Sequence, residues 1–228
     1  MSREEYFRRY LVYMTGLYIM ALGLAMIIVA ELGTSPVSTW TYVMSLNTPP
    51  SVGMWTFILS IILIVGQVVV LYRHGLRQEI SNIVLQLPFA VVFGAFIDFN
   101  LLLVTKVPLS SDYSSRLLML LVGIVVQSYG IMLEVKAGVA MTSAEAFVNY
   151  VSRRVKKPFG TLKVGFDVLL VLLAAATSVA FSLSAHRPVW PDVISIVREG
   201  TVIAALTTGM FVNFFARRDK TEQFILNS

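Results

Sequence analysis

Two short segments of this 228-residue chain begin with the same pair of hydroxyl residues. The pairs are Thr34 with Ser35 and Thr142 with Ser143. Hydroxyl side chains are favoured at helix N-caps, and Pro36 and Glu145 strengthen the signal, since proline suits a first turn and T-x-x-E forms a capping box. Backbone N–H groups at a helix start, together with the positive end of the helix dipole, favour an anionic ligand. We therefore predict that both pairs and Glu145 bind substrate.

A second polar pattern follows each pair at a spacing of i and i+4, which places two side chains on one helical face. Thr56 and Ser60 follow the first pair, and Lys163 and Asp167 follow the second. An ionisable side chain inside a membrane helix costs roughly 2.5 to 3.5 kcal/mol on insertion scales, so the charged pair should face protein or water. We predict that Thr56, Ser60 and Lys163 line the substrate site and that Asp167 binds a coupling ion or lies on the pathway.

Other roles for these charged residues stay open. Lys163 can extend to the membrane surface with Asp167 following it, or the two can form a purely structural ion pair. Glu134 lies inside another apolar run and is a further candidate for the pathway. Three glutamines lie within the apolar runs, and their side-chain amides are expected to form hydrogen bonds between helices: Gln67, Gln86 and Gln127.

The elements that must hold these residues are apolar helices. Hydrophobic residues make up 57% of the chain and charged residues only 14%, whereas a soluble domain is about 25% charged. With a mean hydropathy of +0.77, the chain is predicted to be an all-α integral membrane protein. Six runs approach the ~20 residues that a helix needs to cross a bilayer. They are Tyr10–Val29, Val52–Tyr72, Ile80–Val104, Leu117–Lys136, Leu162–Leu183 and Gly200–Ala216.

The two halves of the chain resemble each other at an offset of about 107 residues, which indicates a duplication. The matched residues include Gly16 with Gly123, Gly23 with Gly130, and Tyr42 with Tyr150. Three spans in each half would invert the second copy in the membrane. We therefore predict two inverted three-helix repeats, at residues 1–108 and 109–228, within one membrane domain. The glycines spaced by seven are expected to mark close helix contacts.

The segments that begin with the hydroxyl pairs, residues 33–44 and 141–151, are too apolar for a solvent loop and too short to span a membrane. We predict that each is a re-entrant half-helix buried among the other spans, since irregular backbone is not tolerated against lipid. The alternative is a pair of amphipathic helices lying in the membrane interface.

Basic residues gather in alternate connections between the apolar runs. They precede the first run and follow the second, fourth and sixth, at Arg3, Arg8, Arg9, Arg73, Arg77, Arg153, Arg154, Lys156, Lys157, Arg217, Arg218 and Lys220. Because basic connections stay on the cytoplasmic side of a membrane, we expect both termini to be cytoplasmic.

Three motifs carry a resemblance to a known family. Residues 30–36 read AELGTSP, residues 51–55 read SVGMW and residues 94–98 read GAFID. In these motifs the chain resembles the bacterial YczE/YyaS-like integral membrane proteins, which are related in pattern to YitT-type proteins. The resemblance covers most of the chain and implies a multi-pass protein of the bacterial inner (plasma) membrane, without implying a substrate.

We expect this protein to move a small polar solute, anionic or zwitterionic, by alternating access. One alternative is a substrate-binding membrane subunit of an ATP-driven importer of the energy-coupling-factor kind, and another is an accessory scaffold for a secretion or biosynthesis complex. The expected partners are the lipid bilayer, the solute and a coupling ion, H⁺ or Na⁺; a homodimer is left open, and nucleic acid is not expected.

Enzymatic function finds no support in the sequence. The chain contains no H-E-x-x-H, Walker A or G-x-S-x-G motif, and both histidines fall in predicted loops. We therefore expect no catalytic residues, no cofactor and no metal site.

Overall fold

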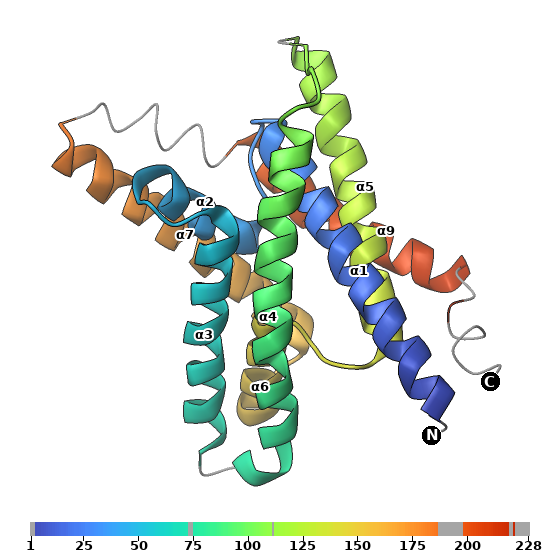
Figure 1. Ribbon diagram of the computed structural model, residues 1–228. Coiled ribbons are helices and arrows are strands. Elements are labelled where there is room, and N and C mark those ends of the chain that lie inside the picture. The colour runs from blue at the N-terminus through green and yellow to red at the C-terminus, as the bar shows by residue number, and fades with distance from the viewer. Residues whose placement is uncertain (1–2, 73–74, 111, 187–197, 219–220, 222–228) are drawn as a thin grey trace. The chain divides into compact units, whose positions relative to one another are not determined.

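The computed structural model describes residues 3–72, 75–110, 112–186, 198–218 and 221, and these residues form eight α-helices (Figure 1). The helices are α1 (Arg3–Val29), α2 (Pro36–Asn47), α3 (Val52–Leu71), α4 (Leu76–Val104), α5 (Tyr113–Ala137), α6 (Ser143–Val155), α7 (Phe159–Ser184) and α9 (Glu199–Arg218). Six of them are long and apolar enough to cross a membrane, namely α1, α3, α4, α5, α7 and α9. The all-α prediction and the six predicted runs are therefore confirmed. The two shorter helices, α2 and α6, fall where the half-helices were predicted.

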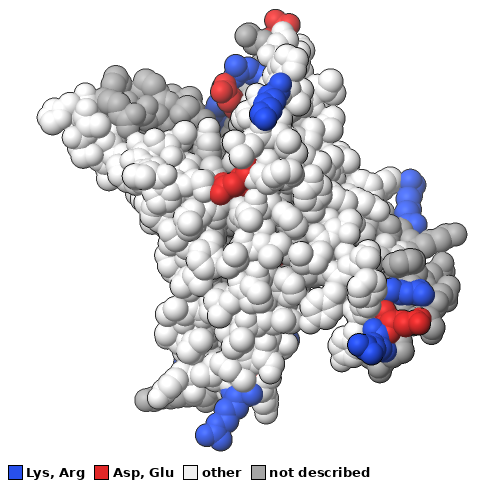
Figure 2. Space-filling view, in the orientation of Figure 1, with Lys and Arg blue, Asp and Glu red and all other residues white. Residues whose placement is uncertain are grey.

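Most of the long helices extend beyond the apolar runs because polar residues continue them. Helix α1 begins at Arg3 rather than at Tyr10, and Glu5 in its first turn forms an ion pair with Arg9 at 2.9 Å. Acidic residues in a first turn also interact favourably with the helix dipole. On the face seen in Figure 2, Lys, Arg, Asp and Glu lie mainly toward helix ends, and the surface between them is largely uncharged.

Contacts divide the chain into two compact units, each built from separate segments. Unit 1 comprises Met1–Ser35, Phe96–Val139 and Arg198–Ser228, and unit 2 comprises Pro36–Ala95 and Ala140–Val197. Unit 1 thus holds α1, α5, α9 and the end of α4, whereas unit 2 holds α2, α3, most of α4, α6 and α7. Both predicted repeats contribute helices to each unit.

The centre of unit 1 is an antiparallel pair of helices, α1 and α5, brought close by glycines (Figure 1). A Cβ atom on Gly23 would lie 2.3 Å from the backbone N of Gln127, and one on Gly130 would lie 2.4 Å from the backbone N of Met20. Gly16 lies against Gly130 in the same way, and all these approaches are too close for any larger residue. The predicted close contacts of these glycines are confirmed.

The connection after α1 is fastened to the start of α9, also within unit 1. Leu32 is buried in a cluster with Leu120 and Ala204, and its carbonyl accepts a hydrogen bond from the N–H of Gly200 at 2.8 Å. At the next residue, Gly33, φ is +120°, a value that residues with a Cβ rarely adopt. This backbone turn directs the chain from α1 toward α2.

Unit 2 is organised around α3. The short helices α2 and α6 each pack on both α3 and α7. Helix α3 also approaches α4 closely, because a Cβ on Gly94 would lie 2.7 Å from the carbonyl oxygen of Gly53. The contacts of the short helices are consequently made almost wholly inside this unit, where they position the polar residues described below.

Candidate functional site

Helix α6 begins beside the middle of α3 and ends beside the last turn of α3. In its first turn, Ala144 belongs to a buried cluster with Leu59 and Leu63, which lie near the middle of the 20-residue α3. Near the end of α6, Arg154 donates a hydrogen bond to the carbonyl of Val70 at 2.6 Å. The first turn of α6 therefore lies beside α3 at least about one helical turn before its end.

Helix α2 packs against the first turns of α3. Just after its end, Thr48 accepts a hydrogen bond from the indole N–H of Trp55 at 2.8 Å, close to the start of α3. Toward its beginning, Trp40 packs edge-on against Trp55, with ring centroids 5.6 Å apart, and belongs to the cluster that contains Ala144. Residues of α2 and α6 therefore belong to one apolar cluster with residues of α3.

Trp40 brings an unused hydrogen-bond donor into this cluster. Its side chain is only 9% exposed, and its indole N–H donates to no acceptor in the described part of the chain. The neighbouring Trp55 does find an acceptor, at Thr48. A buried polar group without a partner costs about 1 to 3 kcal/mol, so the Trp40 indole marks a place where an added acceptor would be stabilised.

The first turn of α6 presents further donors. Thr142 is the N-cap residue, as predicted, but its side chain makes no capping hydrogen bond to the backbone. Instead the Thr142 hydroxyl bonds to the side chain of Glu145, so the predicted capping box does not form. Among the described residues, the backbone N–H groups of Ser143 and Ala144 have no acceptor. Helix starts with free N–H groups favour anionic ligands.

Glu145 departs from the capping box because it faces two charged residues of α7. The Nζ of Lys163 donates to Oδ1 of Asp167 at 2.5 Å, and Glu145 interacts electrostatically with both residues. We call Glu145, Lys163 and Asp167 the charged triad. Phe166 lies beside it, with the ammonium 5.9 Å from its ring centroid. The predicted pairing of Lys163 with Asp167 is confirmed, and the triad carries two carboxylates and one ammonium.

The corresponding hydroxyls of α3 are engaged with their own helix. Thr56 donates to the carbonyl of Val52 at 2.8 Å, and Ser60 donates to the carbonyl of Thr56 at 2.9 Å. Both side chains are half-buried, and the Thr56 hydroxyl lies 3.5 Å from that of Thr41 in α2. In the predicted alignment of the two halves, these neutral residues stand where α7 carries Lys163 and Asp167.

A pair of glutamines holds the start of α6 in place. The side-chain amides of Gln67 in α3 and Gln86 in α4 donate to each other at 2.9 and 3.0 Å, and Gln67 also donates to the carbonyl of Ser143 at 3.0 Å. Both glutamines are almost fully buried. Their predicted bonding between helices is confirmed, whereas the amide oxygen of Gln127 accepts no bond within the described residues.

The other predicted site residues belong to unit 1. Thr34 is 2% exposed, and its backbone N–H donates to the Thr201 hydroxyl at 3.1 Å. Ser35 is also buried. Glu134 is buried in α5 against α1, where a Cβ on Gly16 would lie 2.9 Å from its backbone N. The remaining seven predicted residues, from Thr56 to Asp167, belong to unit 2.

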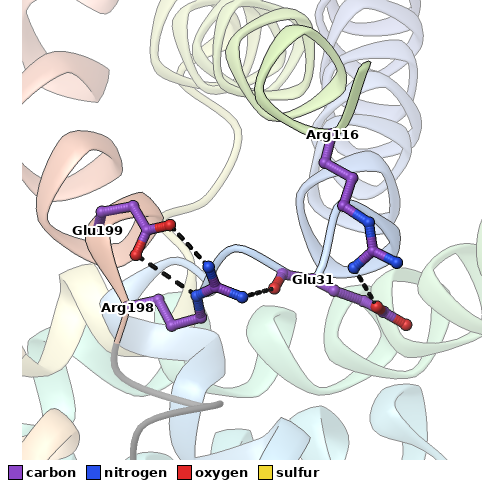
Figure 3. A network of polar contacts seen from close by, with 4 residues as sticks. All are labelled: Glu31, Arg116, Arg198 and Glu199. Carbon is purple, nitrogen blue, oxygen red and sulfur yellow. Dashed lines mark hydrogen bonds and ion pairs between the residues drawn. The ribbon is translucent and has the colours of Figure 1, made fainter. Parts of the chain in front are cut away.

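Next to Thr34, unit 1 carries a surface network of ions (Figure 3). The Glu31 carboxylate pairs with Arg116 of α5, and the Glu31 carbonyl accepts a hydrogen bond from Arg198 at 3.1 Å. Arg198 also pairs with Glu199 at 2.9 Å. Glu31 itself has a φ of +55°. This network fixes the backbone that leads into Thr34, but it is exposed and neutralises itself.

Sequence reasoning singled out neither Trp40 nor the donor contact between Gln67 and Ser143. A tryptophan among apolar residues is usual, and nothing in the sequence marks one whose N–H lacks an acceptor. The interhelical role of Gln67 was accessible from its polar side chain in an apolar run, but its acceptor on α6 was not.

Comparisons with known proteins agree with the resemblance seen in the motifs. The family DUF6198, described as a family of unknown function, matches residues 7–217. The uncharacterized membrane protein YczE of Bacillus subtilis is 26% identical to this chain over 215 residues, which cover 93% of this chain and 87% of that protein. No solved structure matches the chain significantly. The chain is thus homologous to a bacterial membrane protein, and its six candidate spans identify it as multi-pass.

Proposed function

We propose a function from the site itself, because the chain belongs to DUF6198, a family whose function is unknown. The proposed function is transport of a small anionic or zwitterionic solute across a bacterial cell membrane by alternating access. The observation that carries it is one buried cluster that contains both Trp40 of α2, whose indole N–H is unused, and Ala144 in the first turn of α6.

An inverted repeat is part of this proposal. In unit 1, Gly16 lies against Gly130, and Gly123 lies against Gly23. The sequence alignment matches Gly16 with Gly123 and Gly23 with Gly130, so exchanging the two halves converts one contact into the other. In unit 2, the same exchange converts the packing of α2 on α7 into that of α6 on α3. Both patterns are expected of an antiparallel twofold relation, which supports inverted repeats.

The two short helices are proposed to be re-entrant. Gln86, which helps to hold the start of α6, lies ten residues after the start of α4, or roughly 15 Å along a helix at 1.5 Å per residue. Gln67 lies four residues before the end of α3, or roughly 6 Å. The deeper of these two positions is about half of a ~30 Å hydrocarbon core from the turn. A helix start at this level can direct its N–H groups and positive dipole end at a solute anion, as the broken helices of transporters do.

In the proposed site, the solute anion accepts hydrogen bonds from the Trp40 indole and from the free N–H groups of Ser143 and Ala144. The Lys163 ammonium adds positive charge nearby, and the carboxylates of Glu145 and Asp167 suit a solute that also carries an amino group. Amino acids and small carboxylates are therefore the first solutes to test.

The test is a thermal-shift screen of the purified full chain against small carboxylates, inorganic phosphate and amino acids, followed by uptake of any hit into proteoliposomes. A ligand at 100 times its Kd stabilises the folded state by about 2.7 kcal/mol, which such a screen detects. Trp40→Phe should weaken binding about tenfold or more, since a hydrogen bond to a charged group contributes about 1.5 to 3 kcal/mol. The matched control is Trp55→Phe, whose indole already has an acceptor.

Each outcome of this test separates the candidate functions. Saturable uptake by the isolated chain supports the transporter. Binding without uptake contradicts it and favours a substrate-binding subunit that needs ATPase partners. Copurified proteins together with no ligand in the whole panel would favour an accessory scaffold.

A further inference from the structure

The charged triad of unit 2 has one more carboxylate than it has cations, in a region that is otherwise apolar. Helix α6 packs on α3 and α7. Helix α3 has no ionisable side chain between Val52 and Leu71, and the ionisable residues near the start of α7 are Lys163 and Asp167 alone. The triad therefore carries a formal charge of −1 when all three groups are ionised, with no further cation from these packed helices to balance it.

The other ionisable residues of α6 lie at its far end. Tyr150 and Arg153 contact Glu79 of α4 at 3.0 and 3.1 Å, and Arg154 binds the carbonyl of Val70. These contacts form a separate group more than one helical turn beyond Glu145. They leave the charge of the triad unbalanced.

Within the triad, the ammonium is committed to one carboxylate. Lys163 and Asp167 lie one turn apart on the same helix and are joined by a direct hydrogen bond. Glu145 approaches from α6 and receives the Thr142 hydroxyl together with a Coulombic attraction to Lys163, which Asp167 opposes. Glu145 is consequently the carboxylate whose charge is less well compensated.

We propose that Glu145 is the proton-binding residue of this protein, with H⁺ as the coupling ion of the proposed transport; the inference rests on that proposed function. A proton passes from water to the Glu145 carboxylate, and no other bond is made or broken. The neutral carboxyl group leaves Lys163 and Asp167 as a balanced pair. It also removes the negative charge that otherwise stands at the first turn of α6, where the solute anion is proposed to bind.

A proton fits this place better than Na⁺. A metal cation requires several oxygen ligands around it, and the ammonium of Lys163 already occupies the position beside Asp167 and would repel a second cation. The described residues contain no group of three His, Cys, Asp or Glu side chains that could hold a metal ion. The side chains of Lys163 and Asp167 are each 24% exposed, so the triad is not fully enclosed by the protein.

The test is infrared difference spectroscopy on the purified full chain in lipid, without any solute, between alkaline and mildly acidic pH. Protonation of a carboxylate produces the C=O stretching band of a carboxyl group. We expect this band in the wild type, its loss in Glu145→Gln, and its retention in Glu134→Gln, which removes the buried carboxylate of unit 1. In Asp167→Asn the band should appear only at more acidic pH, because the ammonium of Lys163 is then free to compensate Glu145. Replacement of Na⁺ by K⁺ should leave the band unchanged.

Three results would overturn the assignment: no band in the wild type, a band that persists in Glu145→Gln, or a band that Na⁺ abolishes. Where Glu145→Gln fails to fold, Glu145→Asp serves instead, because a band from residue 145 must then shift in frequency. Since no solute is present, failure of this test is distinct from failure of transport, which only the uptake assay reports.

Discussion

The two units of this protein are held together by different means. In unit 1, α1 and α5 touch through their backbones at Gly23 and Gly130, with no room for a side chain between them. In unit 2, the start of α6 is held by buried amides at Gln67 and Gln86 and by an electrostatic contact of Glu145 with α7. Small residues permit close packing where water cannot drive association, whereas polar side chains in a membrane mark sites with a further role. From this difference we expect stability to depend mainly on unit 1 and the proposed function to depend mainly on unit 2.

The largest effect is expected from a methyl group in the contact of unit 1. In Gly23→Ala the new Cβ would lie 2.3 Å from the backbone N of Gln127, so the two helices must separate. We expect a loss of more than about 3 kcal/mol, the upper end of overpacking costs. Size-exclusion profiles and melting temperatures in detergent measure it.

Gly165→Ala in α7 is the matched control for that prediction, since a Cβ there meets nothing within 4 Å among the described residues. It should melt at the wild-type temperature or slightly above, because alanine favours helix over glycine by about 1 kcal/mol. Equal behaviour of the two variants would contradict the division of roles between the units.

In unit 2, Lys163→Met is expected to have the next largest effect. It leaves the carboxylates of Glu145 and Asp167 facing each other without the ammonium. Removing one partner of a buried ion pair costs about 3 to 5 kcal/mol, and partial exposure of these side chains reduces the expected loss to about 2 to 3 kcal/mol. The double variant Lys163→Met with Asp167→Asn should recover most of the lost melting temperature; a further fall would show that repulsion is not the cause.

A smaller loss is expected when the amide pair is broken. Gln67→Leu leaves the amide of Gln86 and the carbonyl of Ser143 without their partner. The expected loss is about 1 to 3 kcal/mol, the cost of an unsatisfied buried group. Adding Gln86→Leu removes one of the orphaned groups, so the double variant should be more stable than the sum of the single losses. Strict additivity in a double-mutant cycle would argue against the pairing.

The smallest effect is expected at the surface network of unit 1. Arg116→Gln removes the ion pair with Glu31, which is largely exposed. Exposed pairs contribute about 0 to 1 kcal/mol, and salt screens them. Melting temperatures of this variant and the wild type should differ little and converge as salt is added. A large fall in melting temperature would indicate that this network contributes more to stability than an exposed ion pair does.

Much of the fold was predictable because a bilayer constrains length and hydropathy so strongly. The six apolar runs each became a helix, and the glycines spaced by seven became the contact of α1 with α5. The pairing of Lys163 with Asp167 was predictable as well, since it lies within one helical turn. The apolar runs and the charged pair are properties of single helices. The glycines were informative because a residue without a side chain, repeated on one helical face, indicates close contact with another helix.

The site was less predictable because its contacts join residues distant in sequence. Glu145 was expected to cap its own helix, and only the packing of α6 on α7 turns it toward Lys163. The unused N–H of Trp40 likewise depends on what surrounds it in the folded unit. Nor does hydropathy reveal that each unit combines segments from both halves of the chain.

The discontinuity of unit 1 has a consequence for how the protein is made. The ribosome delivers α1 first, and α5 emerges only after α2, α3 and α4 have been synthesised. Until then the glycine face of α1, with Gly16 and Gly23, has no partner of its own chain, and lipid or an insertion chaperone must cover it. A nascent chain that stops before residue 113 therefore cannot bury this face against α5.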